Sequence, residues 1–314
     1  MKKTGIAVLL FVCLALLFPA LASAEGITYT NKTGSITVEK YAQRIDLGNL
    51  VVEDSDQAYL QFEAFLAKLP KLKQVDMYAT DIQRNRIQEL AVRFPDVEFG
   101  WTMVIPCVNT LHPERTPHRI RTDATAFSTL HNNSCTDHVA EDFSILKYCK
   151  NLQALDIGHN RVTDLSFLYD LPHLKVLIVA CNIELEDITP IGSLTELQYL
   201  EIFKNKIGDI SCLANCKELI DLNICFNHIS NWAPLYGLTR LRRLWVYNSN
   251  LLNYNDVATM PPEEVQALRE HLPDCKIDAV HWSTDGGWRD GHPRYLTISA
   301  MFWGSEYIPF DYFD

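Results

Sequence analysis

The sequence predicts an α/β solenoid: a curved right-handed superhelix with a parallel sheet on its concave side and longer helical coils near both ends. An LxxLxLxxN frame recurs between residues 142 and 250, and its first leucines are Leu152, Leu174, Leu197, Leu219 and Leu241. The steps between them are 22, 23, 22 and 22 residues. A fixed period of this length indicates coils that bury their apolar sides only by stacking on one another.

Each frame predicts one short strand, because its apolar residues alternate at period two. The two inward columns are Leu155, Leu177, Leu200, Leu222 and Leu244, and then Ile157, Val179, Ile202, Ile224 and Val246. Four frames close on an asparagine: Asn160, Asn182, Asn205 and Asn227. A buried amide both donates and accepts hydrogen bonds, so we expect these asparagines to form a structural ladder between coils.

A short polar residue precedes each frame and predicts a helical turn on the convex side, because its side chain can accept from backbone N–H groups. These residues are Asp142, Asp164, Asp187, Asp209 and Asn231. In these residues the chain resembles the bacterial internalin-like leucine-rich repeats, most closely over DITPIGSLTELQYLEIFKNKIGDI. The resemblance covers about residues 142 to 250. It implies a protein that binds other proteins through the concave sheet and is not an enzyme.

Weaker frames extend the predicted repeat domain over residues 25–280. Early coils are expected at Ile45 and Leu47, at Leu72, Val75 and Met77, at Phe94, Val97 and Phe99, and at Pro117, Ile120 and Thr122. Helical segments, DQAYLQFEAFLAKL and PPEEVQALREHL, lengthen coils near the two ends, and LPDCKID copies FPDVEF so that Cys275 takes the place of Val97. Residues 106–140 are expected to leave the solenoid as an irregular loop. The aromatic residues 281–314 are expected to cap its last coil.

Residues 1–24 predict a secretory signal peptide, with Lys2 and Lys3, an apolar run and the exit Ala22-Ser23-Ala24. Its removal takes two of the 28 basic residues and none of the 39 acidic ones, which leaves 26 minus 39, a net charge of −13. This charge disfavours nucleic acid as a partner. We therefore expect a secreted, extracytoplasmic protein with no membrane insertion after signal removal.

The loop also suggests a metal or disulfide site. His131, Cys135 and His138 could share a zinc ion with Cys107, although their spacing matches no familiar zinc module. Alternatively, Cys107 and Cys135 form a disulfide. The sequence favours no bound metal and no cofactor.

The concave face is the predicted binding site, because aromatic and charged side chains gather on its later strands. The candidates are Tyr199, Glu201, Phe203, Asp221, Phe226, Arg243, Trp245 and Tyr247. A protein ligand is the favoured partner, and a glycan stacked on the aromatic rings is a second possibility. The alternative is that the terminal segment folds back over these side chains.

Catalytic motifs such as GxSxG, HExxH and the phosphate-binding loop are absent from the sequence. The sequence thus predicts an exported binding protein and no enzyme. The rival hypothesis is a metal-binding or hydrolytic protein that uses the loop from Cys107 to His138.

Overall fold

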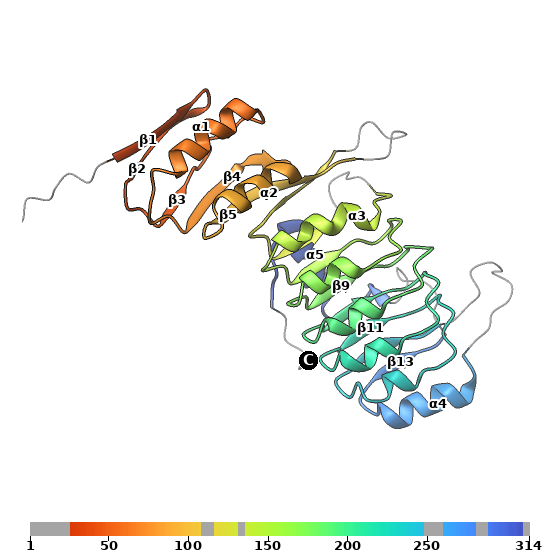
Figure 1. Cartoon of the computed structure of the whole chain (residues 1–314). Coiled ribbons are helices and arrows are strands. Elements are labelled where there is room, and N and C mark those ends of the chain that lie inside the picture. The colour runs from red at the N-terminus through yellow and green to blue at the C-terminus, as the bar shows by residue number, and fades with distance from the viewer. Residues whose placement is uncertain (1–25, 108–115, 131–135, 248–259, 281–287, 310–314) are drawn as a thin grey trace, which may run out of the picture.

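A computed structural model describes residues 26–107, 116–130, 136–247, 260–280 and 288–309. The chain forms two successive parts of one elongated molecule (Figure 1). The first part begins with an antiparallel hairpin of β1 (Gly26–Asn31) and β2 (Gly34–Glu39). The rings of Tyr29 and Phe62 lie 5.4 Å apart, so the hairpin packs on the first helix. The repeat pattern does not predict this hairpin.

The first part continues as a four-stranded sheet in the order β3-β4-β5-β6. Its elements are β3 (Arg44–Asp46), α1 (Asp56–Leu66), β4 (Gln74–Ile82), α2 (Arg84–Arg93), β5 (Glu98–Ile105) and β6 (His118–Arg121). The first three strands are parallel, as expected for coils, but β6 is antiparallel to β5. The prediction of a further parallel coil at Pro117, Ile120 and Thr122 is therefore wrong. The first sheet ends instead in the antiparallel strand β6.

The register of β5 also differs from the predicted frame. Val75 pairs with Phe99, where the repeat frame had placed Val97. A slip of two residues leaves every side chain on its original face, so apolar alternation alone cannot detect it. The same slip occurs in the last coil, where Ile277 rather than Cys275 pairs with Leu244.

The second part is the regular solenoid, with a seven-stranded parallel sheet in the order β13-β12-β11-β10-β9-β8-β7. Its strands are β7 (Ala126–Ser128), β8 (Ala154–Asp156), β9 (Val176–Ile178), β10 (Tyr199–Glu201), β11 (Asp221–Asn223), β12 (Arg243–Trp245) and β13 (Lys276–Asp278). The fold class predicted from the repeat is confirmed. Residues 106–140 are not one irregular loop, because β6 and β7 lie within them.

The convex side consists of short helical turns stacked at the same spacing. They are α3 (Ala140–Phe143), then 3-10 turns at Ser144–Tyr148, Ser166–Asp170, Thr189–Ser193, Ser211–Asn215 and Ala233–Leu235, and finally α4 (Pro262–His271). Asp164, Asp187 and Asp209 each accept a hydrogen bond from the backbone N–H two residues on. This is the turn-starting contact expected of them. The longer helices α1 and α4 stand near the two ends of the repeat, as predicted, and α2 is a further helix that was not predicted.

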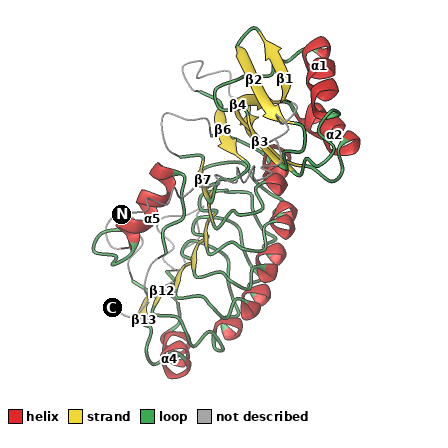
Figure 2. Cartoon of the chain, turned by 90° about the vertical axis from the view of Figure 1, so that its left-hand side faces the viewer, coloured by secondary structure: helices red, strands yellow, loops and turns green. Residues whose placement is uncertain are grey.

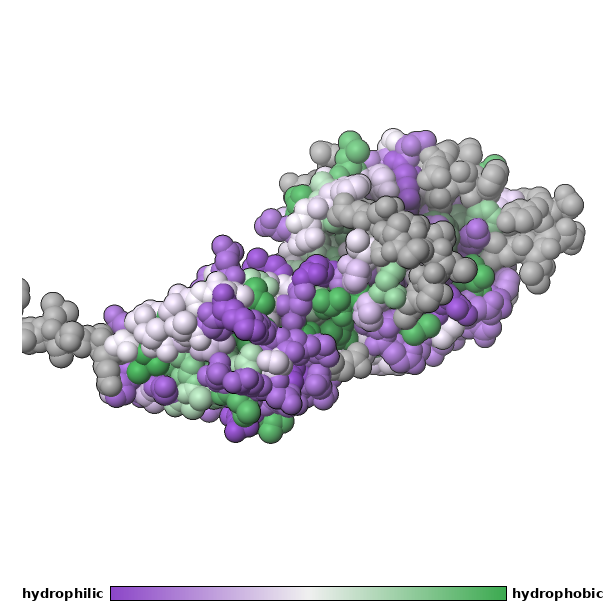
Figure 3. Space-filling view, turned by 90° about the horizontal axis from the view of Figure 1, so that it is seen from above, coloured by the Kyte–Doolittle hydropathy of each residue, from purple (hydrophilic) through white to green (hydrophobic). Residues whose placement is uncertain are grey.

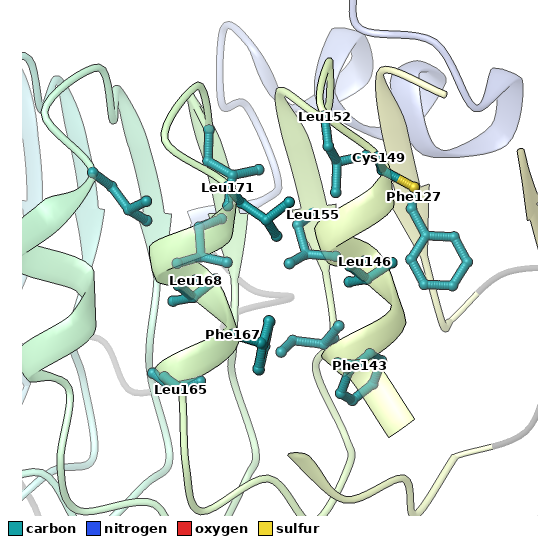
Figure 4. Close-up of a cluster of buried hydrophobic side chains, with 14 of the residues drawn as sticks. Phe127, Phe143, Leu146, Cys149, Leu152, Leu155, Leu165, Phe167, Leu168 and Leu171 are labelled. Carbon is teal, nitrogen blue, oxygen red and sulfur yellow. The ribbon is translucent and has the colours of Figure 1, made fainter. Parts of the chain in front are cut away.

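One apolar core runs through both sheets, from Tyr29 to Leu272. Figure 4 shows how it is built in two coils: Leu155 and Phe127 from the sheet side meet Leu146, Phe143 and Leu168 from the convex side. All five are buried. In the space-filling view of Figure 3, hydrophobic residues appear as separate patches among hydrophilic ones.

Candidate functional site on the concave sheet

The structure brings the eight predicted binding residues together on the concave side of β10, β11 and β12. Seven of them are buried, with at most 9% of the residue surface exposed, and Phe226 is half-buried. The expectation that these side chains face solvent is therefore wrong. With the aromatic rings covered, this set offers no open platform on which a sugar ring could stack.

The covering element is residues 288–309, which we call the C-terminal strap. It includes α5 (Tyr295–Gly304), and Figure 2 shows this helix across the sheet from the stacked convex turns. Trp288, Ile298, Met301 and Phe302 of the strap are buried against the sheet. They form a second apolar core, whose sheet residues are Ala126, Ala154, Val176, Ile178, Ala180, Tyr199, Phe203, Cys225, Trp245 and Tyr247. The described part of the predicted cap therefore covers the concave face, and its helix α5 contacts β7 and β8 rather than the last coil, as the prediction had it.

Trp288 anchors the strap on β10. Its indole N–H lies 2.9 Å from both the Tyr199 hydroxyl and Oε1 of Glu201. The Tyr199 hydroxyl donates in turn to Glu201. Burial raises the pKa of Tyr199 well above its ordinary value, and the Glu201 carboxylate adds to this effect. Tyr199 therefore stays neutral and serves as a hydrogen-bond relay.

Two arginines of the strap pair with carboxylates of the sheet. Arg294 makes two hydrogen bonds with Asp221, at 2.8 and 2.7 Å, and Arg289 lies 3.2 Å from Glu201. Burial raises the pKa of Asp221, and the Arg294 guanidinium opposes that rise. A forked pair of this kind fixes orientation as well as charge. The ion pairs therefore set the register of the strap on the sheet.

His292 and Arg243 complete the centre of the site. The His292 ring packs 5.1 Å from that of Trp288, and its Nε2 lies 3.7 Å from Asp221. Burial, with Arg243 and Arg294 nearby, lowers the pKa of His292 to about 3, so the ring is neutral at pH 7. Arg243 lies 5.1 Å from the Trp288 ring and reaches the Trp288 carbonyl at 3.5 Å.

A third carboxylate, Asp156, lies farther along the same face on β8. It accepts hydrogen bonds from the Ser128 hydroxyl and the Gly158 N–H, both at 3.0 Å. Burial nevertheless raises its pKa to about 6. The concave face thus carries three buried carboxylates, two of which pair with strap arginines.

The four asparagines occupy equivalent buried positions at the strand ends. Each amide donates to backbone carbonyls of its own coil, and its oxygen accepts from a backbone N–H of the preceding coil. The residue before each one has a left-handed backbone: His159, Cys181, Lys204 and Phe226, with φ of 55 to 60°. The amides therefore hold a turn that non-glycine residues adopt only at a cost.

Only two of the four loop candidates for a metal site, Cys107 and His138, lie in the described residues. Cys107 is disulfide-bonded, so it offers no thiolate to a metal. His131 and Cys135 lie outside the described residues. His138 is buried, with its ring 5.1 Å from that of His118. Across the described ranges, no group of three or more His, Cys, Asp or Glu side chains is placed to hold a metal ion.

The alternative that the terminal segment folds back over the concave side chains is confirmed for the described strap. The strap residues that hold it in place were not predicted, although a signal for them was present. Residues 288–294 read WRDGHPR, so an indole and two arginines stand close together in an acidic chain. Asp156, Glu201 and Asp221 occupy outward strand positions of the repeat. Opposite charges at these two places could have suggested that the segments meet.

The fold and this face define a leucine-rich-repeat solenoid whose concave sheet holds a segment of its own chain. The family model "Leucine Rich repeats (2 copies)" matches residues 150–193. A search of curated proteins finds no match.

Solved structures with a similar repeat include two internalins of Listeria monocytogenes. Internalin C2 is 22% identical, covers 60% of this chain and 68% of its own, and has a TM-score of 0.33. The internalin inlF is 19% identical over 78% of this chain and 70% of its own, with a TM-score of 0.39. A leucine-rich-repeat protein of Leptospira interrogans is 17% identical over 74% of this chain and 59% of its own, with a TM-score of 0.41. Among the described helices, none is long and apolar enough to cross a membrane.

Proposed function

We propose that the protein is an exported binding protein, without enzymatic activity, that recognises another protein through the concave side of its repeat sheet. Leucine-rich-repeat proteins generally mediate protein–protein interaction. The observation that carries the proposal is that this sheet already holds a polypeptide segment, through the contacts of Trp288, Arg289 and Arg294. A surface that positions one segment by buried ion pairs has the rigidity and chemistry to position another.

Export is supported by the apolar leader in residues 1–24 and by the disulfide bond of Cys107, because disulfides form and persist in oxidising compartments. The net negative charge supports a protein partner over nucleic acid. These features support an interaction at or outside the cell surface.

The test is to capture partners of the mature protein from extracellular and cell-surface extracts, purify the best candidate and confirm binding by calorimetry. Hydrogen exchange then maps the contact. The proposal expects altered exchange, in either direction, at strap residues 288–309 and strands β10 to β12. Changes confined to the convex turns, such as Ser166–Asp170, would contradict the use of the concave side.

A further inference from the structure

The concave face forms an acidic trough, which we define by Asp156, Glu201 and Asp221. All three carboxylates are buried. The sheet contributes the cation Arg243 to this face, and the strap contributes Arg289 and Arg294. The trough therefore complements a cationic segment, because removal of such a segment would leave Glu201 and Asp221 without the arginines that now offset their burial.

The strap is held by side chains and not as an added strand. Between the described strap and sheet, the hydrogen bonds join two side chains or a side chain and a backbone group. The decisive groups are the indole of Trp288, the guanidinium of the next residue in the sequence, Arg289, and the guanidinium of Arg294, five residues after Arg289. A segment of another protein with this spacing presents the same groups.

The strap satisfies the trough incompletely. Within the described residues, four groups at this interface contain buried nitrogen atoms without a hydrogen-bond partner. They are Asn223 Nδ2, Arg243 Nε and Nη1, Arg289 Nε, and His292 Nε2. An unpaired buried donor weakens an interface. Acceptors placed near Arg243 and Asn223 would satisfy donors that the strap leaves unpaired.

The outer face of α5 is apolar as well. Leu296 is 83% exposed and Trp303 is 60% exposed, while Ile298, Met301 and Phe302 of the same helix are buried. A helix that is apolar on both faces is usually covered on both.

We propose that the acidic trough is a recognition site for a segment of a partner protein carrying an indole and two guanidinium groups in this spacing. The strap is an intramolecular ligand that occupies the trough until the partner segment displaces it. This inference rests on the proposed function and adds the chemistry of the partner to it.

The test uses the full mature chain and a fluorescent peptide with the sequence of residues 288–309. Arg294→Glu places a carboxylate against Asp221 and drives the strap off the trough. In wild type, the peptide can bind only those molecules whose own strap has left the trough. This variant should therefore bind the peptide at least about tenfold more tightly than wild type. Fluorescence anisotropy measures both affinities.

Matched controls isolate the contacts. Arg269→Glu makes the same charge change on the exposed side of α4 and should bind like wild type. A peptide carrying Arg294→Ala should bind the opened variant more weakly, as should a second protein variant with Asp221→Asn added. Circular dichroism checks that each protein is folded. If Arg294→Glu fails to fold, the neutral Arg294→Gln replaces it.

Equal peptide affinities for wild type and a folded opened variant would overturn the inference, as would binding that ignores the arginines of the peptide. A wild-type dimer in analytical ultracentrifugation that Arg294→Glu abolishes would also overturn it, because the occupant would then be a second copy's strap. A captured partner that binds wild type and the opened variant equally leaves the proposed function standing without this inference.

Discussion

Substitution of one ladder asparagine tests whether the repeat depends on buried amides. Asn205 is fully buried; its oxygen accepts from Asn182 N at 2.8 Å, and its nitrogen donates to the carbonyls of Val179 and Ile202 at 3.1 and 2.9 Å. In Asn205→Ala, the Asn182 N–H loses its partner. The two carbonyls keep donors, because Asn182 Nδ2 still reaches Val179 and Asn227 Nδ2 still reaches Ile202.

The structure therefore sets the size of the effect. One orphaned N–H costs about 2 kcal/mol, and two weakened carbonyl pairs add about 1 kcal/mol, so Asn205→Ala should lower the free energy of unfolding by about 3 kcal/mol. Urea denaturation followed by circular dichroism measures the change. The exposed Asn151→Ala is the control and should shift stability by less than about 0.5 kcal/mol. Indistinguishable midpoints for the two variants would refute the ladder argument.

Three further predictions concern the strap and the face beneath it. Burial raises the pKa of Asp156 from 3.8 to about 6, so the folded state binds more protons than the unfolded state between these values. This group's contribution is most favourable below pH 3.8 and declines by about 3 kcal/mol as the pH rises to 6. Asp156→Asn should remove that decline, which urea denaturation midpoints at pH 4 and 7 measure. If the midpoints of wild type and Asp156→Asn change by the same amount between the two pH values, the carboxyl is not buried. Trp288→Ala should cost about 3 to 5 kcal/mol and speed proteolysis of the strap before that of the repeats; cleavage that starts elsewhere contradicts the anchor role. On α5, Leu296→Ala should change stability by less than about 0.5 kcal/mol, whereas Ile298→Ala should cost about 2 to 4 kcal/mol, and equal costs would show that the helix faces are misassigned.

The regular coils could be predicted because their signals are local. Each frame places Leu155 or its equivalent inward, and each stacks on a neighbour only about 22 residues away in the chain. Strand direction, the convex turns and the positions of the four asparagines all follow from that period.

Register and sheet ends could not be predicted in the same way. The pairing of Phe99 with Val75 differs from the predicted frame by two residues, and both registers bury the same face. The reversal at β6 likewise leaves Ile120 inward, so the pattern of apolar residues fits a parallel or an antiparallel strand equally.

The candidate site shows the same division. The repeat alone placed Tyr199, Glu201, Asp221 and Trp245 together on one face, because strand neighbours in a parallel sheet share their side-chain direction. Whether that face meets solvent depends on Trp288, which contacts Tyr199 across 89 residues of sequence. A contact at that separation leaves no periodic trace in the sequence.

By itself, then, the sequence determined the solenoid, its core columns and the chemistry of its concave face, since each depends on contacts between adjacent coils. Only the tertiary structure decided what lies on that face. The strap could have capped the end of the last coil or covered the sheet, because both surfaces bury aromatic side chains. The carboxylates of Glu201 and Asp221 favour the sheet, since they pair with the strap arginines only when the whole fold brings them together.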